Sequence, residues 1–298
     1  MAVTFEFTSP DQSPPLVVRR AAVALCVGEL DPTGRQGLLA DLRALAAVAV
    51  RGAVVPTFVG GQSMSPESLV ETWDHVHADL PIDAIKIGRL GGERAVRVLA
   101  ERLEDAAHPR VVVDPSFLDP YGEPRISDAV ALAWRTHILP HALIVCVNLI
   151  EAWRLFGRRC EDRRAMLEAA HRLRDLGPKW VVITGGRLEG HPVDLAYDGT
   201  GSVELGADRI SGNRLPHTGG TFTAFLTGEL ARGLSVPAAL ERARAAVNPA
   251  LAGASPLLEH GAAIEPMASV YTDLGLDPLP VSVVVPQASG VEDGSLTP

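Results

Sequence analysis

Short β-branched runs alternate with helix-length apolar patterns along most of the chain, and this alternation limits the possible folds more than any other feature. Between the runs, leucine and alanine recur at intervals of three and four, as in residues 38–46 and 166–176. Strands that alternate with helices predict an α/β domain with a mostly parallel sheet and crossover helices. The expected strands are residues 21–27, 53–58, 84–87, 110–113, 142–147 and 180–183.

Both ends of the chain differ from this pattern. Residues 1–15 and 277–298 are rich in Pro, Ser, Gly and Asp and have no periodicity. We therefore expect an N-terminal extension, one domain over residues 16–276, and a flexible C-terminal tail. The whole chain of 298 residues is 47% hydrophobic, which is enough to form one large core.

Charge and cysteine content exclude several classes of protein. The net charge of -9 argues against a nucleic-acid partner, because such proteins carry a basic surface. There is no apolar run of about 18 residues, so we expect no membrane span, and the N-terminus lacks the pattern of a signal peptide. Cys26 and Cys146 lie in apolar runs and are predicted core residues of a reducing compartment. A cytoplasmic protein is expected.

Polar turns follow several of the expected strands, and ligands gather at the carboxyl ends of strands in open α/β sheets. The first such segment has a carboxylate at each end, Asp31 and Asp41, and two glycines that allow tight turning. It is not a P-loop, because no Gly-Lys-Ser/Thr follows. The carboxylates could hold a polar ligand, or the segment could be a strand-to-helix turn with an Asp N-cap.

Two further turns present amide and carboxylate groups. Gln62 follows two glycines and could offer a donor and an acceptor to the edge of a heterocycle, or it could lie in a polar loop. Asn148 and Glu151 lie three residues apart at an expected helix start. They could orient a hydrated magnesium ion or a phosphate oxygen, or they could form a helix cap with the glutamate at its third position.

The segment from His217 to Thr223 precedes an expected helix over residues 224–233. Its consecutive glycines, Gly219 and Gly220, leave backbone N–H groups accessible at the helix N-terminus. Together with the helix dipole, these groups suit an anion such as a transferring phosphoryl group. The alternative is a flexible turn before a buried helix.

In order and spacing, these segments resemble the hydroxymethylpyrimidine/phosphomethylpyrimidine kinases and their pyridoxal kinase relatives, which are members of the ribokinase-like superfamily. Residues 30–42 are similar to the family's Ser-Asp-Pro-Ser-Gly-Gly-Ala-Gly-Ile-Gln-Ala-Asp-Leu stretch. The resemblance covers roughly residues 21 to 250. Shorter similarities lie at residues 86–88, 113–115, 122–124, 148–152 and 185–190.

The resemblance implies a three-layer αβα fold and phosphoryl transfer from ATP, with Mg²⁺, to a hydroxymethylpyrimidine or its monophosphate on the way to thiamin. A pyridoxal-like substrate and a homodimer are also implied by the pyridoxal kinase relatives and by dimeric family members. The implied site residues fall into three groups. They are Asp31, Asp41, Gln62, Glu29 and Arg89 around the substrate; Asn148, Glu151, Thr184 and Gly186 around the nucleotide, with Glu151 at the metal; and His217, Thr218, Gly219 and Gly220 around the γ-phosphate.

Four positions depart from the family pattern. Gly220 stands where the family has Cys and the wider superfamily Asp, the residue that activates the acceptor hydroxyl. Thr184 stands where the family has Lys, so a cation expected to neutralise phosphate charge is missing. Glu29 replaces a glycine and Arg89 replaces an apolar residue, both beside the substrate.

These departures leave two interpretations open. The first is a kinase that is slow or has an altered substrate, in which His217 supplies the base and Arg35 or Arg187 supplies positive charge. The second is a catalytically degenerate relative that acts as a small-ligand sensor or as a partner protein. Phosphoryl transfer depends largely on positioning and charge stabilisation, so the loss of a base weakens the first interpretation without removing it.

Overall fold

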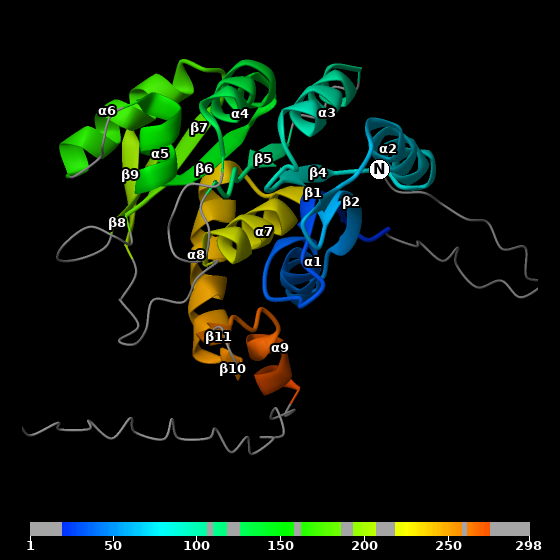
Figure 1. The fold of residues 1–298 in the computed structure, drawn as a ribbon. Coiled ribbons are helices and arrows are strands. Elements are labelled where there is room, and N and C mark those ends of the chain that lie inside the picture. The colour runs from blue at the N-terminus through cyan, green and yellow to red at the C-terminus, as the bar shows by residue number, and fades with distance from the viewer. Residues whose placement is uncertain are drawn as a thin grey trace, which may run out of the picture.

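The computed structural model describes residues 20–105, 110–117, 126–157, 162–185, 193–206, 218–257 and 261–274. A nine-stranded sheet forms the centre of the molecule, with strand order β3-β2-β1-β4-β5-β6-β7-β8-β9 (Figure 1). Six adjacent strands run parallel to one another, in the order β2, β1, β4, β5, β6 and β7. The strands are β1 (Val23–Leu30), β2 (Arg51–Val59), β3 (Gln62–Ser63), β4 (Ala84–Ile87), β5 (Val111–Val113), β6 (Ile144–Asn148), β7 (Trp180–Thr184), β8 (Val193–Tyr197) and β9 (Ser202–Gly206).

The prediction of a mostly parallel sheet is confirmed, and each of the six expected strands is one of the six parallel strands. Three strands were not expected. β3, β8 and β9 are antiparallel additions at the two edges of the sheet. β3 and β9 are the edge strands and lack the continuous apolar run of a buried parallel strand, and β8 is a short buried strand with Asp194 inside it.

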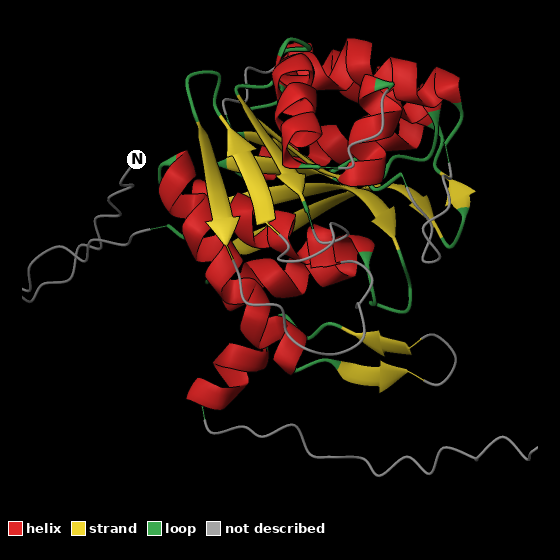
Figure 2. Ribbon diagram, turned by 90° about the vertical axis from the view of Figure 1, so that its left-hand side faces the viewer, coloured by secondary structure: helices red, strands yellow, loops and turns green. Residues whose placement is uncertain are grey.

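Helices cover both faces of the sheet, as Figures 1 and 2 show, so the fold has the three layers of a ribokinase-like protein. Alternation along β1 illustrates the arrangement: Leu25 and Val27 face one layer, and Ala24 and Cys26 face the other. The first layer contains α2 (Pro66–Asp79), α3 (Glu93–Asp105), α4 (Asp128–Ala133), α5 (Leu149–Phe156) and α6 (Arg163–Arg174). The second contains α1 (Gly37–Ala47), α7 (Thr218–Ala231) and α8 (Val236–Ala252).

Short elements complete the described chain. A π-helical turn (Trp134–Ile138) and a 3₁₀ turn (Leu139–His141) lead from α4 into β6. Beyond α8, a hairpin of β10 (Ser255–Leu257) and β11 (Gly261–Ala263) is followed by α9 (Ala268–Asp273), and Figure 2 shows both beyond the main sheet. An ion pair between Arg43 of α1 and Glu265 fastens this C-terminal part to the domain.

Helix α7 begins at Thr218 and not at residue 224, so Gly219 and Gly220 belong to its first turn and do not form a separate turn before it. The expected extension and tail lie outside the described residues, so the domain boundaries stay predictions. Within the described ranges, none of the helices has the length and apolarity that crossing a membrane requires.

Candidate active site

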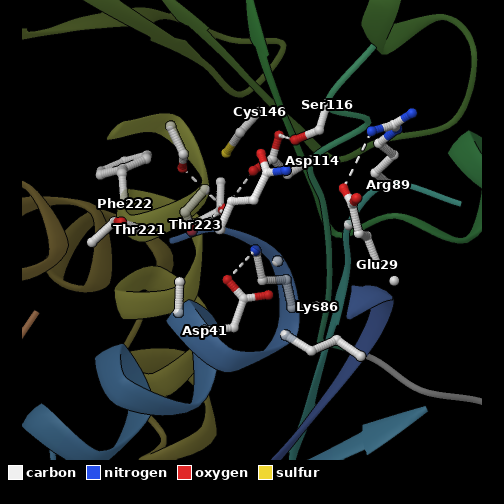
Figure 3. Close-up of a pocket in the computed structure, with 18 of the residues that line it drawn as sticks. Glu29, Asp41, Lys86, Arg89, Asp114, Ser116, Cys146, Thr221, Phe222 and Thr223 are labelled. Carbon is white, nitrogen blue, oxygen red and sulfur yellow. Dashed lines mark hydrogen bonds and ion pairs between the residues drawn. The ribbon is translucent and has the colours of Figure 1, made fainter. Parts of the chain in front are cut away.

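A cavity of about 230 Å³ opens where the parallel strands end and α7 begins (Figure 3). Strands β1, β4, β5, β6 and β7 reach it with their carboxyl ends, the edge at which ligands bind in sheets of this type. Its polar lining consists of Glu29, Arg35, Gln36, Asp41, Lys86, Arg89, Asp114, Ser116, Asn148, Glu151, Thr184, Thr221 and Thr223, with the backbone of Gly219 and Gly220.

Lys86 and Asp41 form a buried ion pair inside this cavity. By the alternation of β4, Ile85 and Ile87 face the α2 and α3 layer, so the side chain of Lys86 lies on the face covered by α1 and α7. Its Nζ donates to Asp41 Oδ1 of α1 over 2.6 Å, and both side chains are almost completely buried. Burial alone lowers the pKa of Lys86, but the carboxylates of Asp41 and Asp114 outweigh it and raise that pKa.

Asp114 directly follows β5 and is buried at the centre of the site. Its backbone N–H donates to Ile87 O over 2.8 Å, which continues the ladder between β4 and β5. Thr223 Oγ1 of α7 donates to Asp114 Oδ2 over 2.8 Å, and Ser116 Oγ donates to Oδ1 over 3.2 Å. Ser116 has a φ of 49°, a left-handed conformation that is costly for a residue with a Cβ and is often found at functional sites.

Asn148 and Glu151 form the capping box that was one of the two interpretations of their spacing. Asn148 Oδ1 accepts from the N–H groups of Ile150 and Glu151, and Glu151 Oε2 accepts from Asn148 N over 3.0 Å. Glu151 Oε1 also accepts from Phe117 N, which ties α5 to the loop after β5. Burial, together with the nearby charge of Asp114, raises the pKa of Glu151 to about 8.

Glu29 and Arg89 form a second ion pair, on the far side of the cavity from α7 in Figure 3. Arg89 Nη1 donates to Glu29 Oε2 over 3.2 Å, and the guanidinium carbon lies 5.0 Å from the centre of the Phe58 ring. The pairing of β1 with β2 shifts register beside this pair, because Gly28 pairs with Pro56 and Glu29 with Phe58, which leaves Thr57 of β2 between them. Irregular pairing of this kind is frequent beside active sites.

The first turn of α7 faces the cavity with the backbone of Gly219 and Gly220. N–H groups in the first turn of a helix have no partner within that helix, and they lie at the positive end of its dipole. Among the described residues outside the backbone of α7, none has an atom within 4 Å of a Cβ added at Gly219, and one added at Gly220 would meet Asp114 Oδ2 at 3.8 Å. Because both glycines line the cavity, an anion bound there would lie next to their backbone.

The structure brings most of the predicted site residues together, with three exceptions among the described part of the chain. Thr218, the first residue of α7, is not among the residues that line the cavity, and neither are Asp31 and Gln62. Asp31 does not line the cavity, and its carboxylate accepts hydrogen bonds from the N–H and the hydroxyl of Thr33. The N-cap of α1 is Gln36, whose side chain makes no capping hydrogen bond. The expected Asp N-cap is therefore wrong. Gln62 is exposed on edge strand β3, beyond a turn in which Gly60 and Gly61 both have positive φ, as a tight hairpin requires.

Three other residues cannot be placed. His217, Gly186 and Arg187 lie outside the described residues, so their roles stay predictions. Thr184, at the end of β7, and Arg35, in the turn before α1, both line the cavity as expected.

Sequence reasoning missed the two residues at the centre of the site, Lys86 and Asp114, although it used the short segments that contain them. The available signal was a lysine inside the apolar run of β4 and an aspartate at the end of β5, because charged residues are almost never fully buried unless they are paired. Cys146 also lines the cavity, and burial raises the pKa of its thiol well above the usual value, so it is neutral there.

Comparison with known proteins finds relatives that match most of the chain. Residues 31–267 match the family model of phosphomethylpyrimidine kinase. The chain is 31% identical over 271 residues to a hydroxymethylpyrimidine/phosphomethylpyrimidine kinase of Streptomyces coelicolor, which covers 86% of the chain and 98% of that protein. A relative of the same description from Synechococcus elongatus is 33% identical over 243 residues, covering 77% of the chain and 91% of the relative.

Solved structures show the same fold. A pyridoxal kinase of Staphylococcus aureus in complex with ADP superposes with a TM-score of 0.78 at 26% identity, covering 84% of this chain and 95% of the other. A pyridoxal kinase of Bacillus subtilis, also an ADP complex, has a TM-score of 0.76 at 26% identity and covers 84% of this chain and 99% of the other.

Proposed function

Because the chain belongs to the phosphomethylpyrimidine kinase family, we propose that it transfers the γ-phosphoryl group of ATP to a hydroxymethylpyrimidine or to its monophosphate. One observation carries the proposal. The first turn of α7, the Lys86–Asp41 pair and the Asn148–Glu151 cap open into one cavity although they come from distant parts of the chain. An anion site, a cation and a carboxylate in one cavity are the parts that phosphoryl transfer requires.

The proposed roles follow from the position of each group. The first-turn amides of α7 bind the phosphoryl group that is transferred. By the resemblance to the family, we assign Asn148, Glu151 and Thr184 to the nucleotide and Glu29, Asp41 and Arg89 to the acceptor. All six residues line the same cavity. Lys86 brings a positive charge into a site in which Thr184 replaces the family's lysine.

Mg²⁺ fits this donor set only as a hydrated ion. Among the described residues no group of three or more His, Cys, Asp or Glu side chains is arranged to hold a metal. Each Glu151 oxygen accepts one backbone N–H and keeps a second lone pair. Mg²⁺ is commonly held by one or two carboxylates together with phosphate oxygens and water, which matches Glu151 beside a bound triphosphate. The ion would neutralise phosphate charge.

An ATP-consumption assay with hydroxymethylpyrimidine, its monophosphate and pyridoxal tests the proposal. The natural chain is expected to consume ATP with at least one pyrimidine acceptor. A variant that combines Gly220→Cys with Thr184→Lys should be faster by about 10²-fold, because one charge-stabilising donor typically contributes that much. Among the described residues outside the backbone of α7, the nearest atom to a Cβ at position 220 is Asp114 Oδ2 at 3.8 Å, which is an ordinary contact distance for a cysteine there.

The same assay distinguishes the kinase from a second candidate function, that of a ligand-binding protein without catalytic activity. The lack of a side chain at Gly220 favours this second function. That function is indicated if the natural chain is inert while the double variant turns over. If neither protein consumes ATP or is stabilised by it, the kinase proposal fails. A pyridoxal-like acceptor, a cytoplasmic location and a homodimer are further proposals that rest on the resemblance to the family.

A further inference from the structure

The residue at position 220 has no side chain, yet a carboxylate faces the space that such a side chain would enter. Among the described residues, and apart from the glycine's chain neighbours and the backbone of its own helix, Asp114 Oδ2 is the one atom within 4 Å of a Cβ built on Gly220, at 3.8 Å. Asp114 comes from the end of β5 and Gly220 from the first turn of α7, so the approach depends on packing between distant segments. The carboxylate lies beside the amides to which we assign the transferred phosphoryl group.

The hydrogen bonds of Asp114 leave one of its carboxylate oxygens available to a further hydroxyl group. Its two oxygens accept from the hydroxyl groups of Thr223 and Ser116. The Thr223 hydroxyl has a single proton and lies within 2.9 Å of Gly220 O and 3.1 Å of Gly219 O as well. The Thr223 proton can therefore turn to a backbone carbonyl and leave Asp114 Oδ2 free for a substrate hydroxyl.

Asp114 also differs from the other carboxylates of the site. Asp41 receives a short hydrogen bond from Lys86, and Glu151 is engaged by two backbone N–H groups at a helix cap. Asp114 also lines the cavity, but within the described part of the chain its carboxylate oxygens accept hydrogen bonds from hydroxyl groups alone. Its backbone is nevertheless fixed, because its N–H donates to Ile87 O over 2.8 Å.

We propose that Asp114 is the general base of this protein and takes the place of the side chain that Gly220 lacks. The proposal rests on the kinase function proposed above. The O–H bond of the acceptor's hydroxymethyl group breaks and its proton passes to Asp114 Oδ2. The acceptor oxygen forms a bond to the γ-phosphorus of ATP, and the bond from that phosphorus to the bridging oxygen breaks. ADP leaves with the electron pair, and the proton on Asp114 returns to water after the product leaves.

The two acceptors of the family provide a test, because only one of them needs a base. A hydroxymethyl group must lose a proton, whereas a phosphomonoester, with a second pKa of about 6, is already ionised at pH 8. In Asp114→Asn, turnover of hydroxymethylpyrimidine should fall by about 10²–10⁴-fold, the usual contribution of a general base. Turnover of the monophosphate should change only a few-fold. The ratio of the two rates, measured on one preparation, is independent of how much of the variant is folded.

A second variant tests the same assignment by rescue. Adding Gly220→Cys to Asp114→Asn restores a thiol next to the lost carboxylate and should raise hydroxymethylpyrimidine turnover at least about tenfold, with little change for the monophosphate. Asp83→Asn serves as the control. Asp83 lies just before β4, and its carboxylate accepts from Val23 N and pairs with Arg20, so its loss should leave the ratio of the two rates unchanged.

Three results would overturn the assignment while leaving the kinase function intact. They are an equal fall of both rates in Asp114→Asn, an unchanged hydroxymethylpyrimidine rate, and a natural chain that phosphorylates the monophosphate but not the alcohol. A natural chain that phosphorylates neither acceptor would overturn the proposed function and the base together.

Discussion

Lys86 shows how a single buried charge can determine the character of a site. It occupies a position on β4 whose neighbours on the same face are apolar, and its side chain is 4% exposed. An ammonium group so placed is stable only with a carboxylate partner, because burial of an unpaired charge is very costly. Asp41 is that partner, so the carboxylate predicted to contact the substrate also holds the lysine in place.

Lys86→Met should therefore destabilise the protein strongly. Removing one member of a buried pair typically costs about 3–5 kcal/mol, because the other charge is left without a partner. Urea denaturation of the two proteins measures the difference, and Asp41→Asn combined with Lys86→Met should recover part of it. The matched control is Arg97→Met, which breaks the exposed Arg97–Glu93 pair and should cost less than about 1 kcal/mol. Equal losses in the two single variants would show that the buried pair has no special role.

At the scale of elements, helix α5 connects stability to the protonation of the site. Its capping box brings Glu151 into the cavity, where burial and the charge of Asp114 raise its pKa to about 8. The folded protein therefore binds this proton more tightly than the unfolded chain. The resulting stabilisation is complete below the ordinary pKa of a glutamate and is lost as the pH rises toward 8.

Glu151→Gln removes the titrating group and keeps a residue that capping boxes accept. The free energy of unfolding of the natural chain, relative to this variant, should fall by more than about 1 kcal/mol between pH 5 and pH 8, since one unit of pKa shift corresponds to about 1.4 kcal/mol. Urea denaturation at several pH values in this interval gives the comparison. A difference between the two proteins that stays constant with pH would contradict the pKa assigned to Glu151.

At the scale of the whole molecule, the cavity joins the two halves of the sheet. Its lining comes from β1, β4, β5, β6 and β7 and from helices α1, α5 and α7, so a ligand bound there contacts both layers of helices. A ligand that binds only the folded protein stabilises it by mass action. Nucleotide binding should therefore stabilise the entire domain.

ATP with Mg²⁺ at one hundred times its Kd should add about 2.7 kcal/mol to the free energy of unfolding. For a domain of this size, such a gain corresponds to an increase in Tm of about 5–10 °C. Differential scanning fluorimetry over a range of ATP concentrations measures it, with Mg²⁺ alone as the reference. The absence of any concentration-dependent shift would contradict the nucleotide part of the site.

The sequence alone determined the parallel core of the sheet, the capping box of α5 and the order of the motifs, because periodicity and caps are local properties that neighbouring residues carry. The tertiary structure decided which polar groups meet. Asp41 and Lys86 are 45 residues apart and Asp114 and Thr223 are 109 apart, so only the packing of α1 and α7 on the sheet brings them together. The same packing leaves Gln62 on an exposed edge strand, because the hairpin at Gly60 and Gly61 pairs β3 with the outer side of β2.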